Sequence, residues 1–153
     1  MKLHYLLFLL SLTTLCLNAI TTFDRFSLED VENMDEAQRV QCVLANMRAL
    51  IATKSCRGCY LARAQLANHD LTDADLEGAN LAHAHLEGSN LTGADLARAN
   101  LTGAHIKGTN FSNAVIIKTI FYNTVDFESA IFNGALRYKD PFKQAQFKKD
   151  FTK

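Results

Sequence analysis

Two cysteines at CxxC spacing, Cys56 and Cys59, are the residues of this sequence best suited to chemistry. A thioredoxin-like redox pair follows a strand and opens a helix, whereas here a predicted helix comes before the pair. A zinc site needs four ligands, usually from two such pairs, and only Cys42 and scattered histidines remain. The pair therefore favours a structural role, as a disulfide or as packed thiols. Cys42 is the odd thiol, able to cross-link two chains.

Two histidines, His85 and His105, are 20 residues apart, and Glu87 is close to the first. Stacked imidazoles can bind a metal or respond to pH, but two ligands without a nearby third are weak evidence. We therefore predict no metal site and no cofactor. No nucleophile, base and orienting group form a recognisable set, and the glycines do not form a phosphate-binding loop. The sequence predicts a protein that is not an enzyme.

The charge balance argues against a general nucleic-acid-binding protein. The 153 residues contain 16 Lys+Arg and 16 Asp+Glu, a formal net charge of zero, whereas nucleic-acid-binding domains are usually basic. The charge is unevenly distributed, however. Residues 60–136 have eight acidic and four basic residues, a net −4, and residues 137–153 have six basic and two acidic residues, a net +4.

Residues 1–19 have the pattern of a secretory signal peptide. Lys2 precedes the apolar run Leu3–Leu17, and Leu17-Asn18-Ala19 ends in a small residue. A retained anchor is the alternative, because the run is close to the shortest length that spans a bilayer. The polar segment that follows at once favours cleavage. We expect export to the periplasm or out of the cell, where disulfides persist.

A helix is predicted over residues 34–53. Asn33 and Glu36 have capping-box spacing. An apolar face at intervals of three and four residues indicates an amphipathic helix packed on a core; it comprises Ala37, Val40, Leu44, Met47 and Ile51. Cys42 lies roughly opposite this face, where we expect it to be exposed.

From Leu61 to Phe121 a Leu, Ile or Phe recurs at every fifth position, and with one exception, His69, a small residue stands two positions before it. Neither a helix nor a flat strand places such residues on one side. A chain that bends after every five residues does, and a glycine two positions after the large residue permits φ > 0 at the bend. Four such bends make a coil of about 20 residues that stacks on the next coil.

The stretch ADLEGANLAHAHLEGSNLTGADLARANLTGA, Ala74 to Ala104, resembles the pentapeptide-repeat proteins with their A(D/N)LXX units. The resemblance covers about residues 59–135 and implies a right-handed quadrilateral β-helix. The preceding ALIATKSCRGCYLARAQL is similar to the helix and CxxC of some exported members, which supports a structural role for Cys56 and Cys59 at the end of the column.

We therefore predict an all-β solenoid of about four coils, with an N-terminal capping helix and a short C-terminal helix. The predicted divisions are a signal peptide (1–19), a segment with the capping helix and CxxC (20–59), the repeat column (60–136) and a basic tail (137–153).

The C-terminal part of the repeat is irregular and apolar. The large residues Phe121 and Phe127 are six positions apart, so one residue is inserted, which we place near Tyr122–Val125. Four apolar residues fall in outward positions and require a cover: Val115, Ile117, Ile120 and Tyr122. The tail begins a helix at Asp140-Pro141 and offers three phenylalanines for this patch, Phe142, Phe147 and Phe151. A second copy of the chain is the alternative cover.

The sequence favours a structural or protein–protein interaction module with an unidentified protein partner, because repeat columns present flat walls rather than deep pockets. Asp75 and Asp95 in line, with Glu77 beside them, form a candidate acidic wall. One alternative is mimicry of duplex DNA against a topoisomerase, which the resemblance implies for some cytosolic family members with acidic walls. Another is binding to a membrane surface through the basic, Phe-containing tail.

Overall fold

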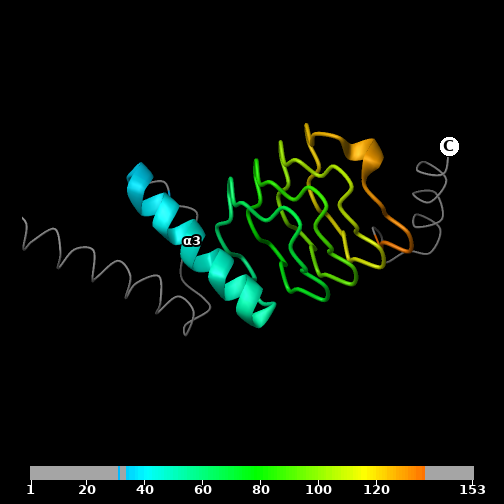
Figure 1. Cartoon of the computed structure of the whole chain (residues 1–153), viewed down its shortest axis with the longest axis horizontal. Helices are drawn as coiled ribbons and strands as arrows, with labels where there is room; N and C mark the ends of the chain where they lie inside the picture. Colours follow the sequence, from blue (N-terminus) through cyan, green and yellow to red (C-terminus); the bar gives the residue numbers. More distant parts are fainter. Residues whose placement is uncertain (1–30, 32–33, 137–153) are drawn as a thin grey trace, which may run out of the picture.

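The computed structural model describes residue 31 and residues 34–136. Within this part of the chain the regular elements are the α-helix α3 (Glu36–Thr53) and the short 3-10 helix η1 (Phe127–Ser129). The chain between them winds into stacked coils, with α3 at one end of the column and η1 at the other (Figure 1). The predicted signal segment and the predicted C-terminal helix with Phe142, Phe147 and Phe151 lie outside the described residues.

Successive coils are joined by single parallel bridges between residues 20 positions apart. Asn80 illustrates the pattern: its amide donates to Cys59 O at 2.9 Å, and its carbonyl accepts from Leu61 N at 2.8 Å. The bridges form four ladders along the column, which begin Ser55–Asp75–Asp95, Tyr60–Asn80–Asn100, Gln65–His85–His105 and Asp70–Asn90–Asn110. The β-helix is therefore built from isolated bridges rather than extended strands.

Each coil bends at tight turns that need positive φ at their third residue. In the first repeat, Ala64 N donates to Leu61 O at 3.0 Å and Arg63 has a φ of 61°, as in a type II turn. Glycine adopts this conformation without strain, and at Gly93 it also makes room, because a Cβ there would lie 2.2 Å from Asp73 Oδ1. The glycines therefore lie at the bends, as predicted. In other turns Asn, Asp, His, Arg or Lys occupies the third position with positive φ.

The core of the column consists of the large repeat residues and the small residues beside them. From Leu61 to Ile116 every large repeat residue is buried, and so are the eight alanines two positions before such residues, from Ala64 to Ala114. Ser89 and Thr109 take alanine positions and remain satisfied, because both hydroxyls donate to Leu86 O at 2.7 Å. The predicted division into inward and outward positions is confirmed over these residues.

His69 is the exception at the small positions, and the hydrogen bond that closes its turn is longer than those at the alanine corners. The turn hydrogen bond from His69 N to Leu66 O is 3.4 Å long, against 3.0 Å at Ala64. The half-buried ring places Nδ1 2.9 Å from Ala67 O, so the imidazole is hydrogen-bonded within its own corner.

The residue that precedes each large position is often Asp or Asn, and the structure gives the reason. The side-chain oxygen of Asn100 accepts from the backbone amide of Thr102 at 3.0 Å, two residues further on, and Asp95 accepts from Ala97 at 2.9 Å. Such local bonds stabilise a turn and satisfy an outward amide. These side chains therefore have a structural role at the corners.

The inserted residue, predicted near Tyr122–Val125, lies directly after Val125. Val125 still pairs with His105 in the 20-residue spacing, whereas Ile131 pairs with Asn110 at a spacing of 21. The extra residue is taken up by η1, where Ser129 Oγ accepts from Gly108 N at 3.0 Å. Because this hydroxyl serves a backbone amide that faces the last coil, the insertion does not leave that amide unsatisfied.

Phenylalanines fill the C-terminal end of the core. Phe111 is fully buried and stacks on Phe132 at a ring separation of 5.0 Å. Phe121 and Phe127 are partly buried and pack edge to face at 5.5 Å. Large rings cover more apolar area than leucines do, and they close the core at the last coil that the structure describes.

Helix α3 covers the opposite end, but with a different face and a different cap from those predicted. It begins after Asp35, which forms a capping box with Gln38, so Asn33 is not the cap. Leu50 is part of the core and Val43 and Met47 pack against it, whereas Val40, Leu44 and Ile51 are exposed. Val43, Met47 and Leu50 also have helical spacing, so two apolar stripes overlap and periodicity alone cannot choose between them.

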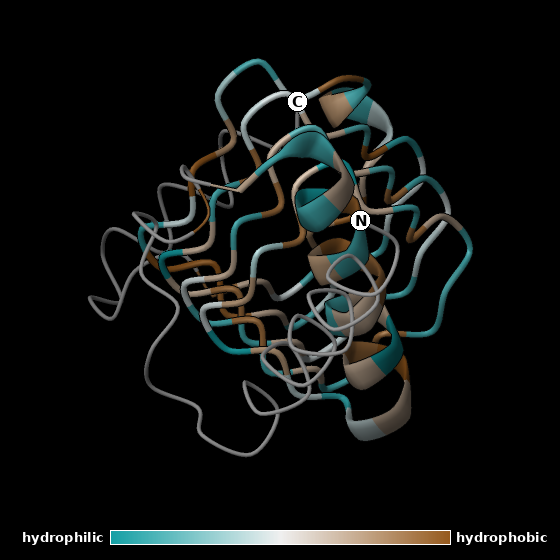
Figure 2. Ribbon diagram, turned by 90° about the vertical axis from the view of Figure 1, so that its left-hand side faces the viewer, coloured by the Kyte–Doolittle hydropathy of each residue, from teal (hydrophilic) through white to brown (hydrophobic). Residues whose placement is uncertain are grey.

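Figure 2 shows α3 lying across the stacked coils. Among the described residues, no helix combines the length and apolar character that crossing a membrane requires.

The buried leucines should dominate the stability of the column. Replacing Leu91, which is fully buried, by alanine is expected to lower the free energy of unfolding by about 2–5 kcal/mol, because the rigid coils cannot close the cavity. Leu136→Ala is the matched control: it is the same truncation at an exposed site and should cost about 1 kcal/mol or less. Urea unfolding followed by circular dichroism measures both, and equal losses would contradict this account of the core.

Candidate functional site

The cysteine pair closes the first turn of the column. Cys56 and Cys59 form a disulfide with a Cα–Cα distance of 5.3 Å, and Cys59 N also donates to Cys56 O at 3.2 Å, as in the later turns. The two residues occupy the large and small positions of the repeat, and both contribute to the core. The disulfide thus replaces a Leu–Ala pair beneath α3.

Helix α3 is held to this first turn by polar contacts as well as by packing. Asn46 Nδ2 donates to Tyr60 O at 3.0 Å. Lys54, the C-cap of the helix, lies 3.3 Å from Asp70 Oδ2. Hydrogen bonds from the Thr72 hydroxyl and amide, followed by that of Lys54, hold the pKa of Asp70 below its usual value. The carboxylate therefore contributes stability above its ordinary titration range, and this contribution is lost as the pH falls through the lowered pKa.

Cys42 is buried, with 6% of its surface exposed, and not exposed as predicted. It lies on α3 next to Val43, and its Sγ is 3.6 Å from Asn46 Nδ2. Cys42 lies roughly opposite the stripe of Val40, Leu44 and Ile51, and the structure exposes that stripe instead of burying it. A thiol buried in this way cannot reach a second chain without movement of α3, so the structure argues against cross-linking through Cys42.

The candidate acidic wall contains arginines as well as carboxylates. Arg57 contacts Asp75 at 3.2 Å and also pairs with Glu77, and the hydrogen bond that Arg57 donates to Asp75 is the main cause that raises the pKa of Arg57. Arg98 lies 3.3 Å from Glu77 on the opposite side. We call the set Arg57, Asp75, Glu77, Asp95 and Arg98 the acid–base wall. Arg57 lies 20 residues before Glu77, so the repeat spacing could have revealed this partner, whereas Arg98 lies 21 residues after Glu77, one position out of line.

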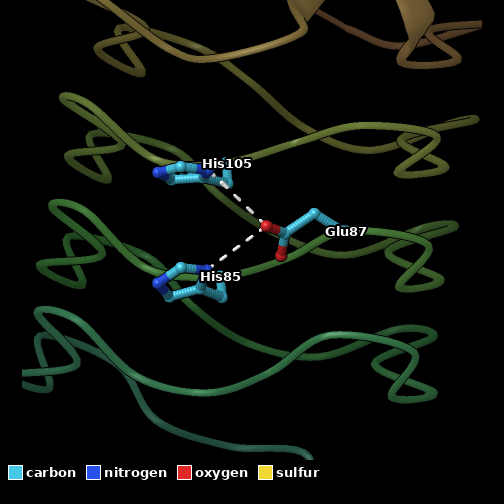
Figure 3. Close-up of side chains that lie close together, drawn as sticks. All are labelled: His85, Glu87 and His105. Carbon is cyan, nitrogen blue, oxygen red and sulfur yellow. Dashed lines mark hydrogen bonds and ion pairs between the residues drawn. The ribbon is translucent and has the colours of Figure 1, made fainter.

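A second polar cluster, His85, Glu87 and His105, lies on another side of the column (Figure 3). The two histidines are bridged across adjacent coils, and their rings stack with centroids 4.7 Å apart. Glu87 Oε1 lies 3.2 Å from His85 Nδ1 and 3.6 Å from His105 Nδ1. The sequence indicated the two histidines in line, and the structure adds Glu87 as a third group at contact distance. We call this set the His–Glu cluster.

All four ladders become apolar at the C-terminal end of the column. Val115 and Leu136 follow Asp95, and Ile120, Val125 and Ile131 follow Asn100, His105 and Asn110. We call the exposed members of this level, together with the neighbouring tyrosine, the apolar collar: Ile120, Tyr122, Val125, Ile131 and Leu136. Of the predicted patch, Ile120 and Tyr122 are exposed, while Val115 and Ile117 are half-buried. Val125, Ile131 and Leu136 were missed, although the ladders place them at the same level.

Comparison with known families identifies the repeat. The model of the pentapeptide repeats matches residues 55–93 and 94–134 with eight copies, which is just over half of the chain. The chain belongs to the pentapeptide-repeat family. No curated protein sequence matches it significantly.

Solved pentapeptide-repeat structures resemble the column. The crystal structure of alr5209, a pentapeptide repeat protein from Nostoc PCC 7120, is similar with a TM-score of 0.51 at 22% identity, over 72% of this chain and 91% of that one. A pentapeptide repeat protein of the Arabidopsis thaliana thylakoid lumen has a TM-score of 0.38 at 28% identity, over 53% of this chain and 56% of that one. QnrB1, a plasmid-mediated fluoroquinolone resistance protein, has a TM-score of 0.33 at 15% identity, over 63% and 62%. The first likeness supports the pentapeptide-repeat fold, and the other two carry no argument about function.

Reduction of the disulfide should destabilise the pentapeptide-repeat column only modestly. The bond closes a loop with a sequence separation of three, for which chain entropy predicts a stabilisation of about 2 kcal/mol or less. A Cys56→Ser, Cys59→Ser double variant is expected to remain folded with a lower urea midpoint, and Cys42→Ser, which leaves the bond intact, provides the control. Complete unfolding of the double variant would show that the disulfide does more than close this turn.

Proposed function

We propose that the protein is an exported, non-enzymatic interaction module that binds another protein through the apolar collar. The observation that carries the proposal is the change in all four ladders at one level of the column. Below it the outward residues are largely Asp, Asn and His, and at it they are Val, Ile and Leu. A wall that only faces water gains nothing from exposed apolar residues, whereas the centre of a protein–protein interface is a contiguous apolar patch.

The exposure of the collar supports a binding role. Ile120 and Tyr122 leave 49% and 68% of their surfaces exposed, and the remaining members are exposed as well. Tyrosine is enriched in interfaces because its ring buries a large area while its hydroxyl keeps a polar partner. The collar also surrounds the phenylalanines that close the core, so a bound partner would extend that closure. The cover favoured by the sequence, the tail with Phe142, Phe147 and Phe151, and a second copy of the chain are alternative occupants of the same surface.

Export and the finer geometry of the fold belong to the same proposal. The signal-like residues 1–19 and the disulfide between Cys56 and Cys59 support an oxidising compartment, the periplasm or the cell exterior. The 20-residue spacing of the bridges over residues 55–136 supports about four coils, which we propose are right-handed as in other pentapeptide-repeat columns. DNA mimicry is less well supported, because Arg57 and Arg98 lie among the carboxylates of the acid–base wall. Membrane binding through the basic tail is likewise less well supported, because it rests on composition alone.

Site-specific photo-crosslinking tests the collar directly. A photoactivatable residue at position 120 should cross-link to another polypeptide in cells, whereas the same residue at position 80, on the polar part of the same ladder, should not. The mass of the product separates a foreign protein from a second copy and from the chain's own tail. Equal labelling from both positions, or an intramolecular product alone, would overturn binding of a partner at the collar.

Substitutions that extend the polar residues of two ladders into the collar provide the matched loss-of-function test. Ile120→Asn and Ile131→Asn place at the collar the residue that precedes each of them on its ladder, Asn100 and Asn110. The fold should therefore remain as stable as before, while the cross-linked partner is lost from a probe at Tyr122. Asn80→Ser, on the polar wall, should leave the cross-link unchanged. A partner retained by the double variant would place the contact elsewhere.

The exported form should begin at Ile20. Cleavage after Ala19 removes the apolar run, and intact-mass spectrometry of the protein from the native compartment measures the result. A full-length chain recovered with the membrane fraction would favour the retained anchor. Recovery of the uncleaved chain in the cytosol would contradict export.

A further inference from the structure

We propose that the His–Glu cluster binds a divalent transition-metal ion, with His85, Glu87 and His105 as its three protein ligands. The site lies on a wall of the column, below the apolar collar, and the inference does not depend on the function proposed for the collar. Imidazole and carboxylate donors together suit Zn²⁺ and related ions. Zn²⁺ is the ion chosen for the test.

The fold does not require histidines at these positions. On the three other ladders, the residues at the same two levels are Asp75 and Asp95, Asn80 and Asn100, and Asn90 and Asn110. Those side chains accept a hydrogen bond from the amide two residues further on. On the fourth ladder, imidazoles stand in both places and face Glu87 instead. His85 and His105 therefore do not make the hydrogen bond to the turn that Asp and Asn make at the equivalent positions. The turn does not explain why histidine occupies both positions, and binding of a ligand would.

The spacing of the donor atoms is close to that of a metal site. Zinc–nitrogen and zinc–oxygen bonds of about 2.0–2.2 Å in a tetrahedron place neighbouring ligand atoms about 3.3–3.6 Å apart. Two of the three distances between donor atoms are close to this value, since Glu87 Oε1 is 3.2 Å from His85 Nδ1 and 3.6 Å from His105 Nδ1. All three donor atoms lie within 4.8 Å of one another. Small rotations of the two stacked rings would bring the donor nitrogens of His85 and His105 to the same separation.

Glu87 carries a second and independent sign of a missing ligand. Its Oε2 atom is buried and has no hydrogen-bond partner, although a buried carboxylate oxygen normally has one. A cation at the cluster would offset the cost of desolvating this oxygen by direct attraction. The cluster as a whole remains reachable, because the side chains of His85, Glu87 and His105 are 38%, 33% and 40% exposed.

The residues around the cluster leave it accessible to an ion. Gln65 lies before His85 on the ladder and Val125 follows His105, so no further charged group stands in line with the two rings. Lys107, 20 residues after Glu87, is the nearest basic residue in register, and it is exposed. Three protein ligands leave the fourth position of a tetrahedral zinc ion for water.

Calorimetric titration of the purified full chain with ZnCl₂ tests the site. We expect saturable binding of one ion per chain. His85→Asn and His105→Asn introduce the residue that the neighbouring ladders use at the same levels, so the column should stay folded while affinity falls at least about ten-fold. Glu87→Gln keeps the shape of the side chain and should weaken binding by a similar factor. His83→Asn is the control, because His83 is an exposed histidine outside the cluster at a φ of 57°, which asparagine tolerates.

Imidazole ¹⁵N spectra of the wild-type chain supply a readout that needs no variant. Zn²⁺ should shift the signals of two histidines together and leave those of His69 and His83 in place. The absence of saturable binding overturns the proposal, as does wild-type affinity in His85→Asn, His105→Asn or Glu87→Gln. An equal loss in His83→Asn would overturn it too, since binding would then be spread over surface histidines.

Discussion

The hydrogen bonds between successive coils are the constraint on which the rest of this structure depends. Up to Val125, each outward residue that precedes a large core residue pairs with the residue 20 positions away, so the peptide groups of one coil satisfy those of the next. This exchange fixes the length of a coil, and the fixed length requires a bend after every five residues. The bends in turn point one large and one small side chain inward. A single spacing thus determines the core, the corners and the walls.

A column built in this way has two open ends, and the chain closes them by different means. At the first coil, α3 lays Val43, Met47 and Leu50 over the core. The disulfide and the contact between Asn46 and Tyr60 hold the helix and the first turn in register. At the last coil, the rings of Phe121, Phe127 and Phe132 close the core, and η1 carries the inserted residue. The apolar collar surrounds this second closure.

The column could be predicted from sequence because its rule is local and repeated. The five-residue period assigned Leu61 to Ile116 to the interior, and the structure buries all of them. The face of α3 could not be derived in the same way, since the stripe through Val40, Leu44 and Ile51 fits a helix as well as the stripe that packs. The position of the inserted residue was also ambiguous, because Val125 fits either spacing until its partner, His105, is known. Asp35 and Asn33 both match the rules for a helix cap.

The polar clusters show a related limit. The 20-residue spacing placed His85 in line with His105 and Asp75 in line with Asp95, but it did not reveal what lies around a corner. Glu87 reaches the histidines from the following turn, and Arg98 reaches Glu77 from the next coil. These contacts depend on the directions of long side chains, which the period does not specify. The walls are thus predictable along the ladders and much less so across them.

The extra residue after Val125 has a consequence for self-assembly. A regular parallel column presents unpaired peptide groups at its last coil, and such an edge can template the addition of another chain. Here the final pairings follow a spacing of 21 instead of 20, and Ser129 occupies one backbone donor. Because η1 replaces a regular turn at this level, a second column placed end to end would not find there the turn that each coil offers to the next. The extra residue therefore acts on the column as a bulge acts on an exposed sheet edge, by making that level a poorer template for another chain.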